Sequence, residues 1–146
     1  MNNKTKSLIF DIFQISSLLF FLFTGPVIAS SSIFVLFQTV AIIILFVAAW
    51  QMRRTKYYRV PDVGKQNELV TDGIYAYVRN PMYLSQLLFC GALLLDVFSI
   101  PRLLVYLIYI TNFILKIRYE ELLLDTHFKE FAGYKKTSWR LFPFVY

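Results

Sequence analysis

A series of four apolar segments limits what this chain can fold into. They cover residues 7–23, 32–50, 82–100 and 103–117, and Pro101 separates the last two. Nineteen helical residues rise about 28 Å, close to the ~30 Å thickness of a bilayer's hydrocarbon core. The composition agrees, because 58% of the 146 residues are hydrophobic and the mean hydropathy is +0.56. We therefore predict a single all-α membrane domain, 1–146, with four transmembrane helices.

The first apolar segment also has features of a signal peptide. Lys4 and Lys6 precede it, and residues 27–30 resemble a cleavage site. Asp11 and Gln14 interrupt the apolar stretch, however, and we expect an uncleaved span.

The positions of the basic residues predict the orientation of these spans. Fourteen of the 15 Lys and Arg residues lie near the N-terminus, in the connection 51–81 or after residue 115, whereas Arg102 lies in the short third connection. An excess of Lys and Arg marks cytoplasmic segments. We expect both termini, and the polar chemistry, on the cytosolic side. Because the charges cluster at the ends of apolar segments, the net charge of +6 does not indicate a nucleic-acid partner.

The stretch GIYAYVRNPMYL, residues 73–84, places polar groups directly before the third apolar segment. Asn80 is a good N-cap and Pro81 suits the first helical position, so one interpretation is simply the start of a helix. A helix start also favours anions through its free N–H groups and its dipole, and Arg79 adds a bidentate donor. An anionic ligand group at residues 79–83 is therefore the functional interpretation.

A pair of carboxylates, Glu120 and Glu121, follows the fourth apolar segment. Lys116 and Glu120 share a helix face because they are four residues apart. One interpretation is a salt bridge to Lys116, Arg118 or Arg79, with Glu121 solvated. The other is a carboxylate that receives a cationic ligand group.

Apolar residues next to and after this pair follow a roughly helical spacing. They are Tyr119, Leu122, Leu123, Phe128 and Phe131. We expect an amphipathic helix that lies on the membrane surface or covers a cytosolic pocket. No His, Cys or acidic cluster has metal-ligand spacing, so we expect no metal.

Two motifs resemble those of the integral-membrane methyltransferases, which include isoprenylcysteine carboxyl methyltransferases and phospholipid N-methyltransferases. The stretch LVTDGIYAYVRNPMYL is similar to that superfamily's first motif. Its second motif, a glutamate pair followed by an aromatic and basic end, is matched by Glu120-Glu121, HFKEFAGYKK and WRLFP. The resemblance covers residues 66–143, and the two motifs occur in the expected order around a predicted helical hairpin.

This resemblance implies a cytosolic S-adenosylmethionine site formed by residues 66–83 and 116–143. It implies a methyl acceptor that is lipophilic, or small enough to reach the site through the membrane, and that enters from the bilayer. No catalytic residue is assigned, since the sequence names no obvious general base, and Arg79 is given a supporting role. Lys116 stands where the carboxyl methyltransferases carry a substrate-binding arginine. The implied cofactor residues are Leu69, Val70, Tyr75, Arg79, Asn80, Pro81, Met82, Tyr83, Glu120 and Glu121.

Two departures from the carboxyl methyltransferase pattern affect the acceptor. That branch has histidine where this chain has Asn80, and lysine at 116 lacks the planar fork that grips a carboxylate. Both favour a phospholipid-methyltransferase-like protein. One alternative is a non-enzymatic membrane partner, which predicts that Glu120 pairs with an Arg or Lys and that no polar cavity lies between the third and fourth helices. The other is a sterol-reductase-like enzyme that uses NADPH.

Overall fold

The computed structural model of the chain describes residues 3–54 and 69–143. The predicted cofactor region begins at residue 66, so its first three residues lie outside the described part. The same holds for Lys56, Arg59 and Lys65, which contributed to the charge argument.

The described residues are helical, as predicted. A single isolated bridge between Val78 and Trp139 is the strand-like pairing recorded among them. The helices are α1 (Asn3–Phe23), α2 (Ser32–Arg54), the 3-10 helix η1 (Gly73–Ala76), α3 (Pro81–Asp96), α4 (Ile100–His127) and α5 (Phe131–Thr137).

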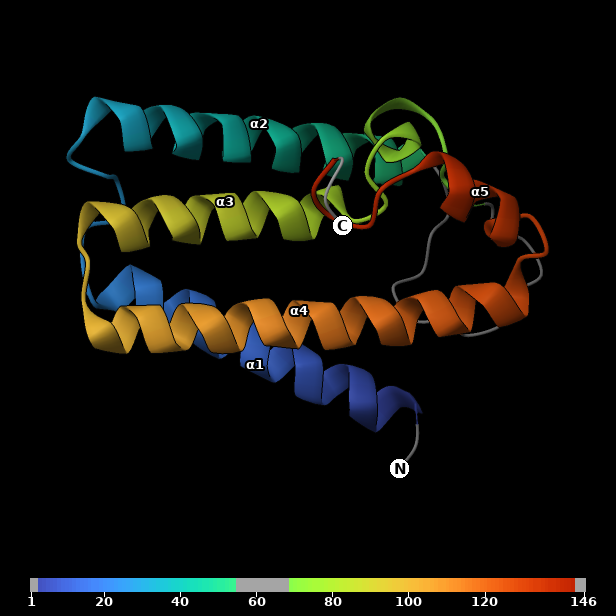
Figure 1. Ribbon diagram of the computed structural model, residues 1–146, viewed down its shortest axis with the longest axis horizontal. Helices are drawn as coiled ribbons and strands as arrows, with labels where there is room; N and C mark the ends of the chain where they lie inside the picture. The colour runs from blue at the N-terminus through green and yellow to red at the C-terminus, as the bar shows by residue number, and fades with distance from the viewer. Residues whose placement is uncertain (1–2, 55–68, 144–146) are drawn as a thin grey trace.

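The four long helices form a bundle in which successive helices run in opposite directions (Figure 1). Helix α2 packs along α3, α1 packs along α4, and α3 lies between α2 and α4. The start of α1, residues 69–80, the end of α4 and α5 therefore lie at one end of the bundle. The polar motifs of the sequence are brought together at this end.

The boundary between α3 and α4 differs from the prediction. We expected the third helix to reach residue 100 and the fourth to cover 103–117, but α3 ends at Asp96 and α4 runs for 28 residues. Pro101 does not break the chain, because it lies in the first turn of α4, where a proline costs no hydrogen bond. Arg102 is consequently a buried residue of α4 rather than part of a connection.

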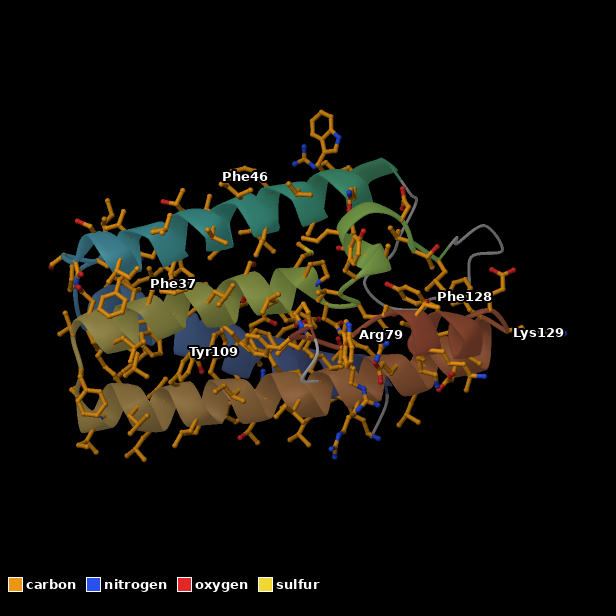
Figure 2. All side chains as sticks on the ribbon, turned by 45° about the horizontal axis from the view of Figure 1, so that its top comes forward. Phe37, Phe46, Arg79, Tyr109, Phe128 and Lys129 are labelled. Carbon is orange, nitrogen blue, oxygen red and sulfur yellow. The ribbon has the colours of Figure 1, made fainter. Side chains whose placement is uncertain are left out.

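Three helices of the described chain, α1, α2 and α4, are long and apolar enough to cross a membrane. Their outward faces carry large exposed apolar side chains, including Ile43 and Phe46 on α2 and Leu107 on α4. Figure 2 shows Phe46 on the side of α2 that faces away from α3. Such surfaces suit lipid rather than water. Helix α3 has 16 residues, which is about 24 Å of rise. It buries much of its surface between its neighbours.

The end of the bundle opposite the motifs is held by side chains that bind backbone groups. Asp96 accepts hydrogen bonds from the backbone N–H groups of Ser30 and Ser31, at 2.8 and 3.1 Å. Gln38 accepts from the Ala29 N–H and donates to the Val27 carbonyl, both at 2.9 Å. The connection between α1 and α2 is thus fixed to α2 and α3.

Candidate functional site

A cavity of about 310 Å³ lies at the end of the bundle where the two motifs meet. It falls within the size range of ligand pockets, and its walls combine apolar side chains with a few polar ones. Every one of the ten residues that the resemblance implied for the cofactor lines this cavity. The complete lining is Met52, Leu69, Val70, Tyr75, Arg79, Asn80, Pro81, Met82, Tyr83, Gln86, Glu120, Glu121, Leu124, Phe131 and Tyr134.

The 3-10 helix η1 begins at Gly73, where the backbone conformation favours glycine. Gly73 has a φ of +57°, which other residues adopt with strain, and a Cβ there would lie 1.9 Å from Nε2 of Gln51. Gln51 of α2 in turn accepts a hydrogen bond from the Ile74 N–H at 3.1 Å. This close contact sets η1 against α2 and places the buried Tyr75 in the cavity wall.

Helix α3 begins at the cavity, but Asn80 does not cap it with its side chain. Its Nδ2 instead donates to the Arg140 carbonyl at 2.9 Å, while its own carbonyl accepts from the Tyr83 and Leu84 N–H groups. The predicted N-cap is therefore correct in position and wrong in its hydrogen bond. The Met82 N–H has no hydrogen-bond partner among the described residues. That donor is available to a ligand in the cavity.

Glu121 holds the site together as part of a buried ion-pair cluster. Its two carboxylate oxygens accept from Nε of Arg79 at 3.0 Å and from Nε of Arg140 at 2.8 Å. The expectation that Glu121 is solvated is wrong, because its side chain is only 9% exposed. Arg79 thus pairs with Glu121, the glutamate that was expected to be solvated, and not with Glu120. This cluster joins α4, the loop before α3 and the C-terminal segment.

Arg79 lies between the start of α3, α4 and α5, in the centre of the site (Figure 2). Its Nη1 donates to the Lys135 carbonyl at 3.2 Å, to Oγ of Ser138 at 3.1 Å and also to the Ser138 carbonyl. Its Nη2 has no partner among the described residues. The guanidinium is thus fixed by protein groups and retains one donor nitrogen for a ligand.

Glu120 faces the cavity in a different setting from its neighbour. The Tyr83 hydroxyl donates to both of its oxygens, at 2.8 and 3.0 Å. The Tyr83 ring stacks on Phe113 with centroids 4.7 Å apart, which fixes the ring across the gap between α3 and α4. One residue from each motif therefore makes a direct contact in the cavity wall.

Helix α5 and the segment after it cover this end of the cavity. Phe131 and Tyr134 line it, and the Tyr134 hydroxyl donates to the Tyr75 carbonyl at 2.5 Å. Burial raises the pKa of Tyr134 to about 12, although Arg79 acts in the opposite direction. The separate amphipathic helix expected from Tyr119, Leu122, Leu123, Phe128 and Phe131 is not formed as predicted. The first three of these residues belong to α4, Phe128 is the C-cap of α4, and only Phe131 lies in the short α5.

Lys116 does not line the cavity. It is buried beneath it, where its ammonium donates to Oδ1 of Asp11 at 2.6 Å and to Oε1 of Gln14 at 2.8 Å. Its ammonium also lies 5.1 Å from the centre of the Tyr83 ring. The two polar residues that interrupt the first apolar segment thus bind the one lysine in the middle of α4.

Five cavity residues were not among the predicted site residues, and Phe131 had been expected only in a covering helix. They are Met52, Gln86, Leu124, Phe131 and Tyr134. Gln86 carried a usable signal, since it is a polar residue one helical turn after Met82 inside an apolar segment. Leu124 lies one turn after Glu120 on the same face. Met52 and Tyr134 are placed by long-range packing and carried no comparable signal. Among the described residues, no group of His, Cys and acidic side chains is placed to hold a metal ion.

Fold and site together describe a helical membrane protein with a ligand-sized cavity at one end of its bundle. The model of the family described as phospholipid methyltransferase matches residues 31–130, and the chain belongs to this family. Its membership supports a methyltransferase and agrees with the superfamily that the two motifs indicated. Neither the comparison with curated proteins nor the comparison with solved structures gave a match.

Proposed function

We propose that this protein is an integral-membrane methyltransferase that uses S-adenosylmethionine and acts on a lipid acceptor. The observation that carries the proposal is the single cavity shared by the two motifs, with the Tyr83–Glu120 contact in its wall. The family match supports the same class of reaction. The non-enzymatic alternative is disfavoured, because it predicted no polar cavity between α3 and α4.

The residues of the cavity fit the chemical groups of this cofactor. The Met82 N–H and Nη2 of Arg79 suit its carboxylate, and the carboxylate of Glu120 suits its ammonium. The aromatic faces of Tyr75, Phe131 and Tyr134 suit the adenine and the sulfonium. We expect the other predicted residues to contribute shape and backbone contacts.

S-adenosylmethionine supplies a methyl group that is already activated for direct displacement. The task left to the chain is to align the acceptor with that methyl group and to exclude water. Phe131 and Tyr134 shield the cavity on the α5 side, and the cluster around Glu121 holds this cover in place. We expect the acceptor to enter between helices from the bilayer.

The position of Lys116 bears on the acceptor. Its charge is neutralised by Asp11 beneath the cavity. Arg79 pairs with Glu121 through Nε, and we assign its Nη2 to the carboxylate of the cofactor. A substrate carboxylate would therefore not meet the cation that the carboxyl methyltransferases use. We propose a phospholipid headgroup as the acceptor, with its amine as the nucleophile after it has lost one proton to the solvent.

We also propose that all four long helices cross the membrane, with the cavity and both termini on the cytosolic side. Helix α3 is short for a span but lies antiparallel between the longer α2 and α4. Among the described residues, the basic ones other than Arg102 lie toward the end that carries the cavity, the distribution that the positive-inside rule predicts for a cytosolic side.

Binding of the demethylated cofactor S-adenosylhomocysteine tests this proposal by calorimetry on the purified protein in detergent. We expect Glu120→Gln and Tyr83→Phe to weaken binding about tenfold or more. Glu120→Gln removes the charge that suits the cofactor's ammonium, and Tyr83→Phe removes the hydroxyl that orients the Glu120 carboxylate. Asp125→Asn is the matched control, because Asp125 lies on the same helix and pairs with Lys135 at the surface. Wild-type protein that binds no cofactor would rule the proposal out.

A further inference from the structure

A chain of polar side chains runs from α1 to the cavity through the interior of the bundle. It begins with the ion pair of Asp11 and Lys116 and continues to Gln14, which is 8% exposed. Nε2 of Gln14 then donates to Oε1 of Gln86 at 2.9 Å. Polar side chains inside a membrane domain are costly, and their presence calls for a function or a binding role.

The direction of every hydrogen bond in this chain is set by its first member. An ammonium only donates, so Gln14 must present its amide oxygen to Lys116. The amide nitrogen of Gln14 is then directed to Gln86, which must present its own oxygen. The Tyr109 hydroxyl, which lies between α3 and α4 (Figure 2), donates to the same oxygen at 2.8 Å.

The amide nitrogen of Gln86 is consequently the last group of this hydrogen-bonded series, and it is the one left to bind a group in the cavity. It donates one hydrogen bond, to the Met82 carbonyl at 3.3 Å. Its second N–H has no partner in the part of the chain that the structure describes, and Gln86 lines the cavity. The charge of Lys116 thus determines, through Gln14, that Gln86 presents an N–H donor to the cavity.

We propose that Gln86 binds the methyl acceptor by donating a hydrogen bond to one of its oxygens, and that Gln14 and Lys116 are positioning residues for this donor. The inference rests on the proposed function and adds a substrate-binding residue to it. Gln86 lies four residues beyond Met82, which is about 6 Å further along α3 and away from α5. An acceptor arriving from the bilayer would reach this part of the cavity, whereas the cofactor groups suit the helix start.

The choice of variants separates this role from a purely structural one. Gln86→Met keeps the volume and removes the donor. Gln14→Glu keeps a partner for Lys116 but turns the amide of Gln86, because a carboxylate accepts only, so that the cavity receives an oxygen instead of an N–H. Ser85→Ala is the matched control, since Ser85 is buried beside Gln86 and bonds the same Met82 carbonyl at 2.8 Å without lining the cavity.

The experiment measures transfer of labelled methyl from S-adenosylmethionine to an amine-headgroup phospholipid in mixed micelles. We expect Gln86→Met and Gln14→Glu each to raise KM for the lipid about tenfold, the effect of one lost hydrogen bond, with kcat and the Kd for S-adenosylhomocysteine unchanged. The double variant should be no worse than Gln86→Met alone. If Gln86→Met does not fold, Gln14→Glu carries the test.

Three results would overturn the inference: an unchanged KM, a Kd for S-adenosylhomocysteine that rises together with KM, or an equal effect of Ser85→Ala. The second result would mean that Gln86 contacts the cofactor. Active wild-type protein with unaffected variants removes this inference alone. Wild-type protein that neither binds cofactor nor transfers methyl removes the proposed function as well.

Discussion

Replacing each of the adjacent glutamates of the second motif by glutamine should impair a different property. We expect Glu121→Gln to lower the stability of the fold and Glu120→Gln to weaken cofactor binding. Glu121 lies between two guanidinium groups, and its side chain and that of Arg79 are each 9% exposed. In Glu121→Gln the amide nitrogen would face one of these guanidiniums, donor against donor. Glu120 instead receives the Tyr83 hydroxyl at the cavity, and a glutamine there still offers an oxygen to it.

The magnitude for Glu121 follows from the burial of its partners. Removing one member of a buried ion pair costs 3–5 kcal/mol, and the low end applies because Arg79 keeps three other acceptors and Arg140 is 34% exposed. We therefore expect a loss of about 3 kcal/mol of unfolding free energy. For a chain of this length that lowers Tm by about 6–12 °C.

The assay is thermal unfolding of ligand-free protein in one detergent, followed for both variants and for Asp125→Asn. We expect Glu121→Gln to lose several times more stability than Glu120→Gln, and Glu120→Gln to lose more cofactor affinity at a temperature where both are folded. Equal shifts in Tm for the two glutamate variants would refute the assignment of Glu121 to the architecture and of Glu120 to the ligand.

Two further predictions concern η1 and α5, which both contribute residues to the cavity wall. Gly73→Ala should destabilise η1 and weaken cofactor binding, because a Cβ at this positive φ collides with Gln51. Tm measures the loss of stability, and calorimetry measures the loss of affinity. Gly133→Ala is the control, since a Cβ there meets open space. Tyr134 has a pKa raised to about 12 from its ordinary value of 10.0, so the neutral form is favoured in the fold. The stability it contributes should be complete below pH 10 and be lost as the pH rises through about 12. Tyr134→Phe should flatten the pH dependence of Tm in that range, and an unchanged profile would count against the role of its hydroxyl.

The parts of this molecule that the sequence predicted best are those fixed by local pattern. Continuous apolar runs located α1 and α2, and the motif around Asn80 and Pro81 located the start of α3. The end of α3 was misplaced because Pro101 was taken as a terminator, although a proline is equally suited to a first helical turn. The ten residues predicted for the cofactor line one cavity, and their binding of a cofactor stays a prediction.

The features that the sequence did not predict depend on contacts between distant segments. Nothing local distinguishes Glu120 from Glu121, and their different roles arise only when Arg79 and Arg140 approach from two other parts of the chain. The partners of Lys116 lie more than a hundred residues earlier. A pattern of charges along one helix therefore could not show that this lysine faces α1 rather than the cavity.

Methyl transfer to a lipid is the most direct test of the proposed reaction. The purified protein would be placed in bilayers of an amine-headgroup phospholipid with S-adenosylmethionine labelled in its methyl group, and the label in extracted lipid measured over time. We predict time-dependent labelling by the wild type, a strong loss in Glu120→Gln, and wild-type activity in Asp125→Asn. Folded wild-type protein that leaves the lipid unlabelled, or equal labelling by Glu120→Gln, would contradict the account.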